Sequence, residues 1–335
     1  MLNTAIIGCG AIHSIHAAAL SKSDKARLCA VVDIDKRRAE ESAGKYDCIA
    51  YTDYHDALDD RGIDVVHICL PHYLHAPVAI DAMRSEKHVL LEKPIAISKS
   101  DAEEVVKVAE QTGMRLGVCF QNRYNRTASW IKQLIDSGKV GKVKGVRAFV
   151  TWHRDEAYYR SGEWRGTWDK EGGGVLINQA IHTIDMLRWF VGEVVSVKAS
   201  FDTRLLHNVI EVEDTAEATI FFECGAIALL YATNCFSGNP LPIIELDCEG
   251  AYIRMENNTS VVYRDGTREE INDALSATGE KAYWGISHER LIEDFYGALR
   301  DGRNFAVDGK QGIAALEIVN AMYESGRIRK RVELS

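Results

Sequence analysis

The sequence predicts an α/β protein with two domains, the first built on a doubly wound parallel sheet and the second on a large, mainly antiparallel open sheet. Three observations support this. A glycine-rich turn stands between a strand-like and a helix-like run at residues 8–12, short apolar runs alternate with helical patterns up to about residue 120, and longer strand-like runs follow. We therefore expect one domain over residues 1–122 and another over 123–335.

Composition excludes several classes of function. The 335 residues carry a net charge of −9, whereas a surface that binds nucleic-acid phosphates needs a basic field. No apolar run approaches the roughly 20 residues of a membrane span, and the first residues lack the charged start of a signal peptide. The eight cysteines show no spacing suited to metal binding. We expect a cytoplasmic protein with reduced cysteines, no metal, and no nucleic-acid or membrane partner.

The glycine turn has the context that dinucleotide binding requires. A predicted strand over 4–7 precedes it and a helical run beginning near His16 follows it. Gly8 permits the tight turn, Gly10 lets the backbone approach a pyrophosphate, and the N–H groups of the following helix face the anion. The residues of the turn expected to contact the cofactor are Gly8, Gly10, Ala11 and Ile12.

The third glycine of this fingerprint is replaced by His13, so the helix must stand off slightly from the strand or turn His13 outward. A second predicted strand over 27–32 ends at Asp33, about twenty residues after the turn, where an acid binds the ribose hydroxyls of the cofactor. A carboxylate there repels a 2′-phosphate. The sequence therefore predicts NAD rather than NADP as the cofactor.

The rest of the first domain continues the alternation. We predict helices over 36–44, 54–61, 75–85 and 99–112, and strands over 65–70, 88–91 and 115–120. In such a sheet the ligand lies at the carboxyl ends of the strands. The polar or unusual residues expected there are Leu70, Pro71, His72, His75, Glu92, Lys93, Gln121, Arg123 and Tyr124.

Lys93 is the sharpest of these candidates, since it follows an apolar run and Pro94 fixes the turn behind it. A lysine at a strand's carboxyl end, beside a bound nicotinamide, can hold a hydroxyl oxygen and relay its proton. The alternative is a surface Glu-Lys pair after an edge strand.

Beyond Tyr124 the pattern changes to longer strands. We predict strands over 143–152, 194–201, 215–222, 226–234 and 243–248, a hairpin over 252–255 and 260–263, and helices over 129–137, 177–190, 286–300 and 310–325. A large one-sided sheet leaves an apolar face that needs cover, so we expect a homodimer or homotetramer.

The stretch from Gly172 to Asp185 carries the candidate site of the second domain. Three glycines precede a helical pattern in which Asn178, His182 and Asp185 share one polar stripe, as in a helix that lines a wet cavity. The alternative is an ordinary capped helix whose histidine is a satisfied core or rim residue.

A loop over residues 153–168 mixes arginines with aromatic side chains, which suits a sugar because ring faces pack on indole while hydroxyls form charged hydrogen bonds. A folded-over loop or a subunit contact is the alternative. The candidates in this loop are Tyr158, Trp164, Arg165 and Trp168.

The motifs GCGAIHSIH, LPHYLH, EKP and GGGVLINQAIHTID, in this order, resemble those of the Gfo/Idh/MocA family of oxidoreductases. The resemblance implies an N-terminal Rossmann domain and a C-terminal α/β domain that carries the substrate face and the oligomer contact. It also implies that Lys93 is catalytic and that His182 is the proton acceptor. The family often has an aspartate where this chain has Asn178, and an amide cannot take a proton, so we expect Asn178 to bind substrate.

Together these observations predict NAD-dependent oxidation of a secondary alcohol on a sugar, glycoside or inositol-like cyclitol. We expect His182 to take the hydroxyl proton, Lys93 to stabilise the alkoxide over the nicotinamide, and Asp185 to orient His182. By the resemblance, Trp164 and Arg165 contact substrate or nicotinamide, and Arg123 and Tyr124 do likewise. Two alternatives remain: a redox-neutral enzyme with tightly held NAD (an eliminative glycosidase or aldose–ketose transfer) and a non-catalytic NAD-binding regulator.

Overall fold

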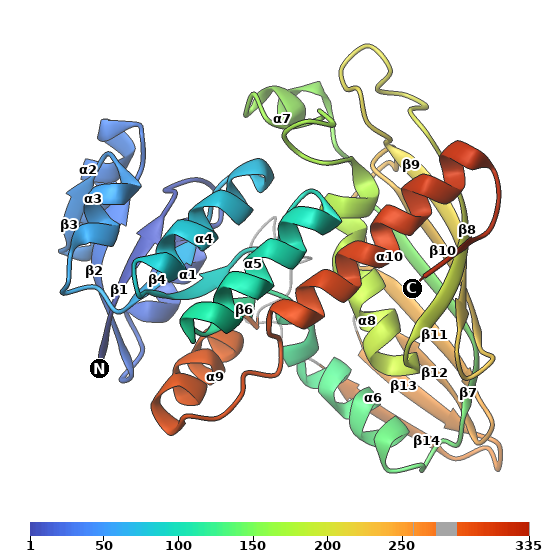
Figure 1. Cartoon of the computed structure of the whole chain (residues 1–335). Helices are drawn as coiled ribbons and strands as arrows, with labels where there is room; N and C mark the ends of the chain where they lie inside the picture. The colour runs from blue at the N-terminus through green and yellow to red at the C-terminus, as the bar shows by residue number, and fades with distance from the viewer. Residues whose placement is uncertain (257, 273–286, 335) are drawn as a thin grey trace. The chain divides into compact units, whose positions relative to one another are not determined.

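The computed structural model describes residues 1–256, 258–272 and 287–334, and its contacts divide the chain into two compact units (Figure 1). The first unit comprises Met1–Gln121 and Ser287–Ile313, and the second comprises Asn122–Ile286 and Ala314–Ser335. The segment 287–313 thus belongs to the first unit, whereas the sequence-based division had placed it in the second domain. No helix of the described residues is long and apolar enough to cross a membrane.

The first unit contains a six-stranded parallel sheet in the order β3-β2-β1-β4-β5-β6. The chain winds outward from β1 in one direction and from β4 in the other, which confirms the doubly wound fold and places the switch point between these two strands. The sequence pattern missed β3, which has only three residues. The strands are β1 (Leu2–Ile7), β2 (Ala26–Val32), β3 (Ile49–Tyr51), β4 (Val65–Ile68), β5 (His88–Leu91) and β6 (Leu116–Val118).

The helices of this unit begin at residues that cap them. The side chain of Asp35 accepts from the backbone N–H groups of Arg37 and Arg38, and Ser98 accepts from that of Asp101. The last long helix of this series ends at Gly113, in the left-handed conformation that glycine favours. The helices are α1 (His13–Leu20), α2 (Lys36–Tyr46), α3 (Tyr54–Asp59), α4 (His75–Arg84) and α5 (Lys99–Thr112), with a short 3-10 helix, η1 (His72–Leu74).

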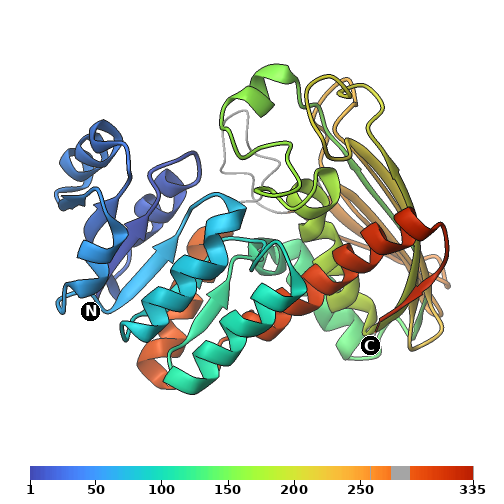
Figure 2. The ribbon, with the colours of Figure 1, turned by 45° about the horizontal axis from the view of Figure 1, so that its top comes forward.

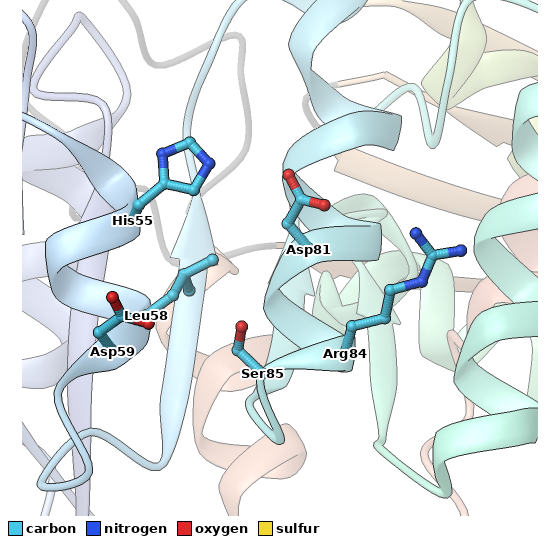
Figure 3. A pocket seen from close by; sticks show the side chains of 6 residues that line it. All are labelled: His55, Leu58, Asp59, Asp81, Arg84 and Ser85. Atoms are coloured by element: carbon cyan, nitrogen blue, oxygen red, sulfur yellow. The ribbon is translucent and has the colours of Figure 1, made fainter.

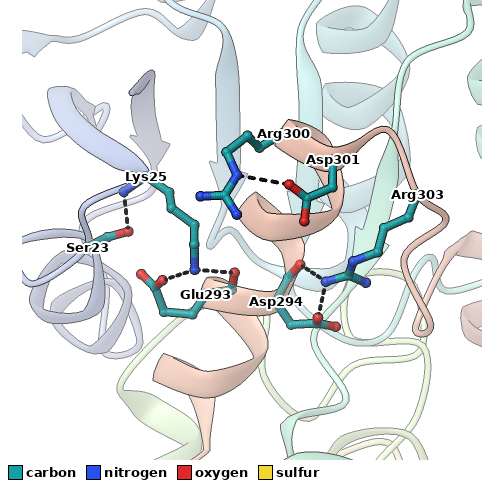
Figure 4. Close-up of polar contacts among 7 residues, drawn as sticks. All are labelled: Ser23, Lys25, Glu293, Asp294, Arg300, Asp301 and Arg303. Carbon is teal, nitrogen blue, oxygen red and sulfur yellow. Dashed lines mark hydrogen bonds and ion pairs between the residues drawn. The ribbon is translucent and has the colours of Figure 1, made fainter.

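Helix α9 (His288–Asp301) returns from the far end of the chain to complete the first unit and packs against α1. Lys25 donates to the carboxylate of Glu293 at 2.7 Å, and Arg303 donates to the backbone oxygen of Asp294 at 3.0 Å (Figure 4). On the buried side of α9, the Tyr296 hydroxyl lies 2.6 Å from that of Thr4 on β1. Residue 286, where we expected this helix to begin, lies outside the described residues.

The second unit contains a nine-stranded sheet in the order β14-β13-β12-β11-β7-β10-β9-β8-β15. Among the strands of the described residues, β7 and β10 alone pair in parallel; the other neighbours are antiparallel, which confirms the prediction of a mainly antiparallel sheet. The strands are β7 (Val143–Thr151), β8 (Val194–Asp202), β9 (Thr215–Phe222), β10 (Ile227–Thr233), β11 (Ile243–Cys248), β12 (Ala251–Met255), β13 (Asn258–Tyr263), β14 (Arg268–Asn272) and β15 (Val332–Glu333).

Helices cover one face of this sheet, and the other face is open (Figures 1 and 2). Side chains alternate along each strand, so Ala148 and Leu230 are buried beneath the helices while Phe149, Ile227 and Leu229 are 36%, 44% and 56% exposed on the open face. The helices of the second unit are α6 (Arg126–Asp136), α7 (Glu156–Arg160), α8 (Ile181–Val191) and most of α10 (Gly309–Ile328), with a 3-10 helix, η2 (Gln121–Tyr124), and a π-helical turn, η3 (Leu176–Ala180).

Candidate active site

The glycine turn after β1 has the geometry that the sequence predicted. Gly8 has a φ of +100°, and a Cβ there would lie 2.5 Å from the carbonyl oxygen of Cys69 at the end of β4. Only glycine fits this position. Gly10 is exposed, and a Cβ there would meet nothing within 4 Å, so the backbone is open to a bulky ligand on that side. Ala11 and Ile12 lead from this turn into α1.

Asp33 lies beside the glycine turn. One of its carboxylate oxygens accepts the backbone N–H of Cys9 at 2.9 Å, and the other accepts that of Asp35 at 2.9 Å. The carboxylate is therefore held where the ribose of a dinucleotide is expected. His13 turns outward, since its ring nitrogens lie 3.0 Å from the Gly10 carbonyl and 3.0 Å from the Ser42 hydroxyl on α2. The glycine turn is therefore intact although His13 replaces the third glycine of the fingerprint.

His75 joins the turn after β4 to the turn after β5. The side chain is fully buried, with Nδ1 2.6 Å from the carbonyl oxygen of Pro94 and Nε2 2.8 Å from that of Leu70. Burial lowers the pKa of His75, although the two carbonyls oppose this change. We therefore assign His75 to holding these two turns together, while direct contact with a cofactor stays a prediction for the half-buried Leu70 and Pro71 and for the buried His72.

Lys93 and Glu92 follow β5 directly and differ in burial. Lys93 is half-buried, and its backbone N–H lies 3.3 Å from the carboxylate of Glu92. The side chain of Glu92 points into the unit, where its Oε1 lies 2.9 Å from Nε2 of His16. The EKP stretch is therefore not the surface Glu-Lys pair of the alternative reading.

The triple glycine of the second unit lies so close to neighbouring segments that side chains would not fit there. A Cβ on Gly173 would lie 2.0 Å from the Tyr323 hydroxyl, and one on Gly174 would lie 1.9 Å from the backbone oxygen of Glu213. This approach lets the Glu213 carboxylate accept the N–H groups of Gly174 and Leu176 at 2.9 Å each and the Tyr323 hydroxyl at 2.9 Å. Burial raises the pKa of Glu213 to about 7 against these donors. Glu213 thus caps the helix that carries the candidate site, a role that no sequence pattern indicated.

The helical stretch after these glycines begins as the π-helical turn η3 and continues as α8. A π turn at a site helix is a common functional irregularity, and it changes which side chains lie above one another. Asn178 and His182 are half-buried, as expected for a lined cavity, whereas Asp185 is 1% exposed. Of the three residues in the predicted polar stripe, Asn178 and His182 are therefore partly accessible and Asp185 is not.

Asp185 pairs with Arg123. Nε and Nη2 of Arg123 donate to the two carboxylate oxygens at 2.8 and 2.5 Å, and its guanidinium stacks 5.6 Å from the ring of Trp189. Burial raises the pKa of Asp185 more than Arg123 lowers it. Because Arg123 is 6% exposed and engaged in this pair, we assign to it a role in ordering α8, while a direct contact with substrate stays a prediction. An effect of Asp185 on His182, three residues away, stays a prediction.

Several polar groups gather around the Tyr158 hydroxyl. Arg165 donates to it at 2.7 Å, and the amides of Asn178 and Gln179 lie at 3.4 and 3.3 Å. Asn178 also donates to Glu171 at 2.5 Å. The guanidinium of Arg165 lies 4.5 Å from the rings of both Tyr158 and Trp164. The loop and the first turn of the site helix therefore form one constellation, which includes Glu171, a carboxylate that sequence reasoning missed.

Trp168 is held by contacts within the second unit. Its Nε1 donates to the backbone oxygen of Glu211 at 2.9 Å, and its ring packs edge-on against Tyr323 at 5.2 Å and beneath the guanidinium of Arg327. Trp168 therefore packs the loop onto the second unit, while its contact with substrate stays a prediction. Gln121 and Tyr124 lie in η2; the first is buried and the second half-buried.

A surface hollow of about 260 Å³ lies elsewhere, between α3 and α4 of the first unit (Figure 3). It contains none of the predicted site residues, and Tyr54 donates to Asp81 beside it at 2.9 Å. The lining residues are His55, Leu58, Asp59, Asp81, Arg84 and Ser85. This hollow is not part of the candidate active site.

Comparison with known proteins agrees with this geometry. Residues 2–120 match the GFO/IDH/MocA oxidoreductase family with an NAD-binding Rossmann fold, and residues 129–254 match the GFO/IDH/MocA C-terminal domain. The chain belongs to the Gfo/Idh/MocA family of oxidoreductases. The resemblance stated from the sequence motifs is therefore confirmed, and this Gfo/Idh/MocA protein is an NAD-dependent dehydrogenase.

Relatives of this Gfo/Idh/MocA protein cover its whole length. Inositol 2-dehydrogenase of Rhizobium meliloti is 28% identical over 339 residues, which cover 98% of each chain. The WlbA dehydrogenase from Bordetella pertussis, solved with NADH and UDP-GlcNAcA, is 28% identical with a TM-score of 0.87 and covers 100% of this chain and 99% of its own. Levoglucosan dehydrogenase, solved with NADH and levoglucosan, shares the fold at 22% identity, with a TM-score of 0.89 and 99% coverage of each chain.

Proposed function

We propose that this dehydrogenase oxidises a secondary alcohol on a sugar, glycoside or cyclitol. The observation that carries the proposal is the constellation around the Tyr158 hydroxyl, in which a phenol, two amides, a guanidinium and the Glu171 carboxylate converge. One of the amides belongs to Asn178, about one helical turn before His182. Such a density of hydrogen-bonding groups beside aromatic rings suits a ligand with many hydroxyls. The relatives' ligands, inositol and nucleotide-linked or anhydro sugars, are of this kind.

The residues of the first unit fit the dinucleotide. The open backbone at Gly10 supports a pyrophosphate contact near the start of α1, and the position of Asp33 beside the glycine turn supports a proposed contact with the ribose hydroxyls. Further residues proposed as contacts or neighbours of the cofactor are Glu92, Gln121, Trp164 and Arg165. When bound, NAD⁺ supplies the hydride acceptor.

In the proposed reaction, His182 accepts the proton of the substrate hydroxyl and Lys93 stabilises the oxygen as its negative charge develops. NAD⁺, when bound, would take the hydrogen of that carbon as a hydride, with both electrons of the carbon–hydrogen bond, and the substrate would become a ketone. Asn178 positions a hydroxyl, since an amide donates and accepts hydrogen bonds but does not take the proton. Tyr124 and Tyr158 contact the ring of the sugar or cyclitol substrate.

An NAD⁺-reduction screen tests this function. The panel holds inositols, aldoses, glycosides and UDP-sugars, together with uronates and sugar phosphates. The acidic sugars are included because Arg165 donates to the Tyr158 hydroxyl beside the amide of Asn178, where its positive charge would attract an anionic group on the substrate. Formation of NADH with one class supports the proposal. Turnover without NADH release would instead support a redox-neutral enzyme, and no turnover together with a captured protein partner would support a regulator.

We propose further that the protein is a homodimer or homotetramer. The open face of the second sheet exposes Phe149, Ile227 and Leu229 on the adjoining strands β7 and β10. Exposed large apolar side chains on a sheet face are a feature of subunit contacts. Light scattering coupled to size-exclusion chromatography measures the mass. A monomer at micromolar concentration would contradict this part of the proposal.

A further inference from the structure

A buried chain of hydrogen bonds runs from β1 to Glu92 inside the first unit. The hydroxyls of Thr4 and Tyr296 are 2.6 Å apart, the Tyr296 hydroxyl lies 2.9 Å from Nε2 of His67, and Nδ1 of His67 lies 3.0 Å from Nδ1 of His16. Nε2 of His16 then lies 2.9 Å from Oε1 of Glu92. All five side chains are at most 7% exposed.

The hydrogen bonds of this buried series can be given donors and acceptors in one consistent direction when Glu92 is ionised. A carboxylate only accepts, so His16 must donate from Nε2, and a neutral His16 must then accept at Nδ1. His67 therefore donates from Nδ1 and accepts from Tyr296, which in turn accepts from Thr4. Each link has one donor and one acceptor, so the arrangement is satisfied with both histidines neutral and one negative charge on Glu92.

The protonation tendencies of the group agree with this direction. Burial raises the pKa of Glu92, but hydrogen bonds from His16 and His288 outweigh it and hold the pKa well below the ordinary value. Burial lowers the pKa of His16 and of His67, which keeps them neutral. Burial also raises the pKa of the neighbouring thiols Cys69 and Cys119, so they carry no charge. The remaining titratable neighbours are His288, whose Nε2 is 3.5 Å from Oε1, and Lys93.

The position of this charge relative to the switch point follows from the sheet. The backbone N–H of Glu92 bonds to the carbonyl of Ile68, the last residue of β4, at 3.0 Å. The carboxylate reaches His16, which lies on the helix that follows the glycine turn after β1. The charge therefore lies among the elements that bound the switch-point crevice of the sheet, where a doubly wound fold binds its nucleotide.

We propose that Glu92 is a fixed, buried negative charge that makes this enzyme bind NAD⁺ more favourably, relative to NADH, than the same fold would without it. The nicotinamide ring is positively charged in NAD⁺ and neutral in NADH. A buried anion near the crevice attracts the first form and acts weakly on the second, and burial prevents salt from screening it. Glu92 thus favours loading of the cofactor form that accepts a hydride.

The test measures the dissociation constants of NAD⁺ and NADH by calorimetry, without substrate. A buried unit charge acting over roughly 10 Å at an effective dielectric constant of about 20 changes such a ratio by roughly tenfold. We expect Glu92→Gln to weaken NAD⁺ binding about tenfold relative to NADH binding.

The control is Tyr296→Phe, which removes the hydroxyl that links Thr4 to His67 but keeps the negative charge of Glu92. The ratio of the NAD⁺ and NADH dissociation constants should therefore stay near the wild-type value. If Glu92→Gln does not fold, His16→Leu/Glu92→Met replaces the pair with apolar side chains of similar volume and should shift the ratio in the same direction. Equal weakening of both cofactor forms in the charge-removing variant would indicate a purely structural role and overturn the proposal. A ratio of the two dissociation constants that Glu92→Gln leaves unchanged would also overturn it. Neither result depends on the identity of the substrate.

Discussion

Arg123 and Asp185 form a buried ion pair in which two guanidinium nitrogens donate to two carboxylate oxygens. The pair joins η2, at the start of the second unit, to the helix that carries His182. We expect Arg123→Met to destabilise the protein by about 3–5 kcal/mol, because it leaves the Asp185 carboxylate buried without its partner.

The double variant Arg123→Met/Asp185→Leu tests this explanation, since it removes both charges. We expect it to recover more than half of the lost stability in urea-unfolding curves. If the effects of the two single substitutions simply add, the ion pair is not the cause of the loss.

Lys93→Ala and His182→Ala should each lower kcat by roughly 10²–10⁴-fold, because each removes a group that handles the substrate hydroxyl. NAD⁺ binding, followed by calorimetry, should survive in both. The control is Lys107→Met, a change at an exposed lysine of α5 whose ion pair with Glu104 lies on the surface. Normal turnover by either active-site variant on a good substrate would refute that residue's assigned role.

Protein stability should depend on pH through Glu213. Its pKa of about 7 lies above the ordinary carboxyl value of 4.5, so the folded state binds this proton more tightly than the unfolded state. The contribution of Glu213 to the free energy of unfolding is therefore fully present below pH 4.5. It is lost as the pH rises through 7, by about 3 kcal/mol in total.

Glu213→Gln, which does not titrate, should show a smaller fall in unfolding free energy between pH 5 and 8 than the wild type. Glu211→Gln, two residues away and exposed, should retain the wild-type slope. Parallel pH profiles for all three proteins would show that Glu213 does not titrate in this range.

The two glycines of the nucleotide turn should respond differently to alanine. Gly8→Ala forces a Cβ to 2.5 Å from a backbone oxygen at a positive φ, so it should lower the melting temperature clearly. Gly10→Ala meets no atom within 4 Å and should leave stability nearly unchanged while weakening NAD⁺ binding at least tenfold. Unchanged cofactor affinity in Gly10→Ala would place the pyrophosphate elsewhere.

Asp33→Asn should reduce the preference for NAD⁺ over NADP⁺. The amide keeps the size of the side chain but removes the charge that repels a 2′-phosphate and strengthens bonds to ribose hydroxyls. We expect NAD⁺ affinity to fall roughly tenfold and the two affinities to converge, as measured by fluorescence titration. An unchanged ratio would mean that Asp33 does not face the ribose.

The sequence predicted most of the first sheet, because its strands are buried on both faces and therefore read as short apolar runs between helices. It also identified the glycine turn, since a tight turn and an open backbone require glycine at defined positions. It did not predict the partner of Asp185 or the cap formed by Glu213. Both depend on which residues distant in sequence become neighbours, and helical periodicity does not contain that information. The π-helical turn escaped prediction for the same reason, since the apolar spacing around Ile177 suits an ordinary helix.

Helix α9 shows a related limit. Its amphipathic pattern predicted a helix, but the pattern does not say which sheet the apolar side covers. Here that side covers the first unit and contributes Tyr296 and His288 to the surroundings of Glu92.

The return of α9 has a consequence for protein engineering. A gene fragment that ends at codon 121 encodes every strand of the nucleotide-binding sheet but omits the segment that closes it. Such a fragment would expose the apolar surface of α1 and leave His67 without its tyrosine. Chimaeras that exchange substrate specificity within this family should therefore graft residues 122–286 together with residues 314–335, and should take residues 287–313 from the parent that supplies residues 1–121.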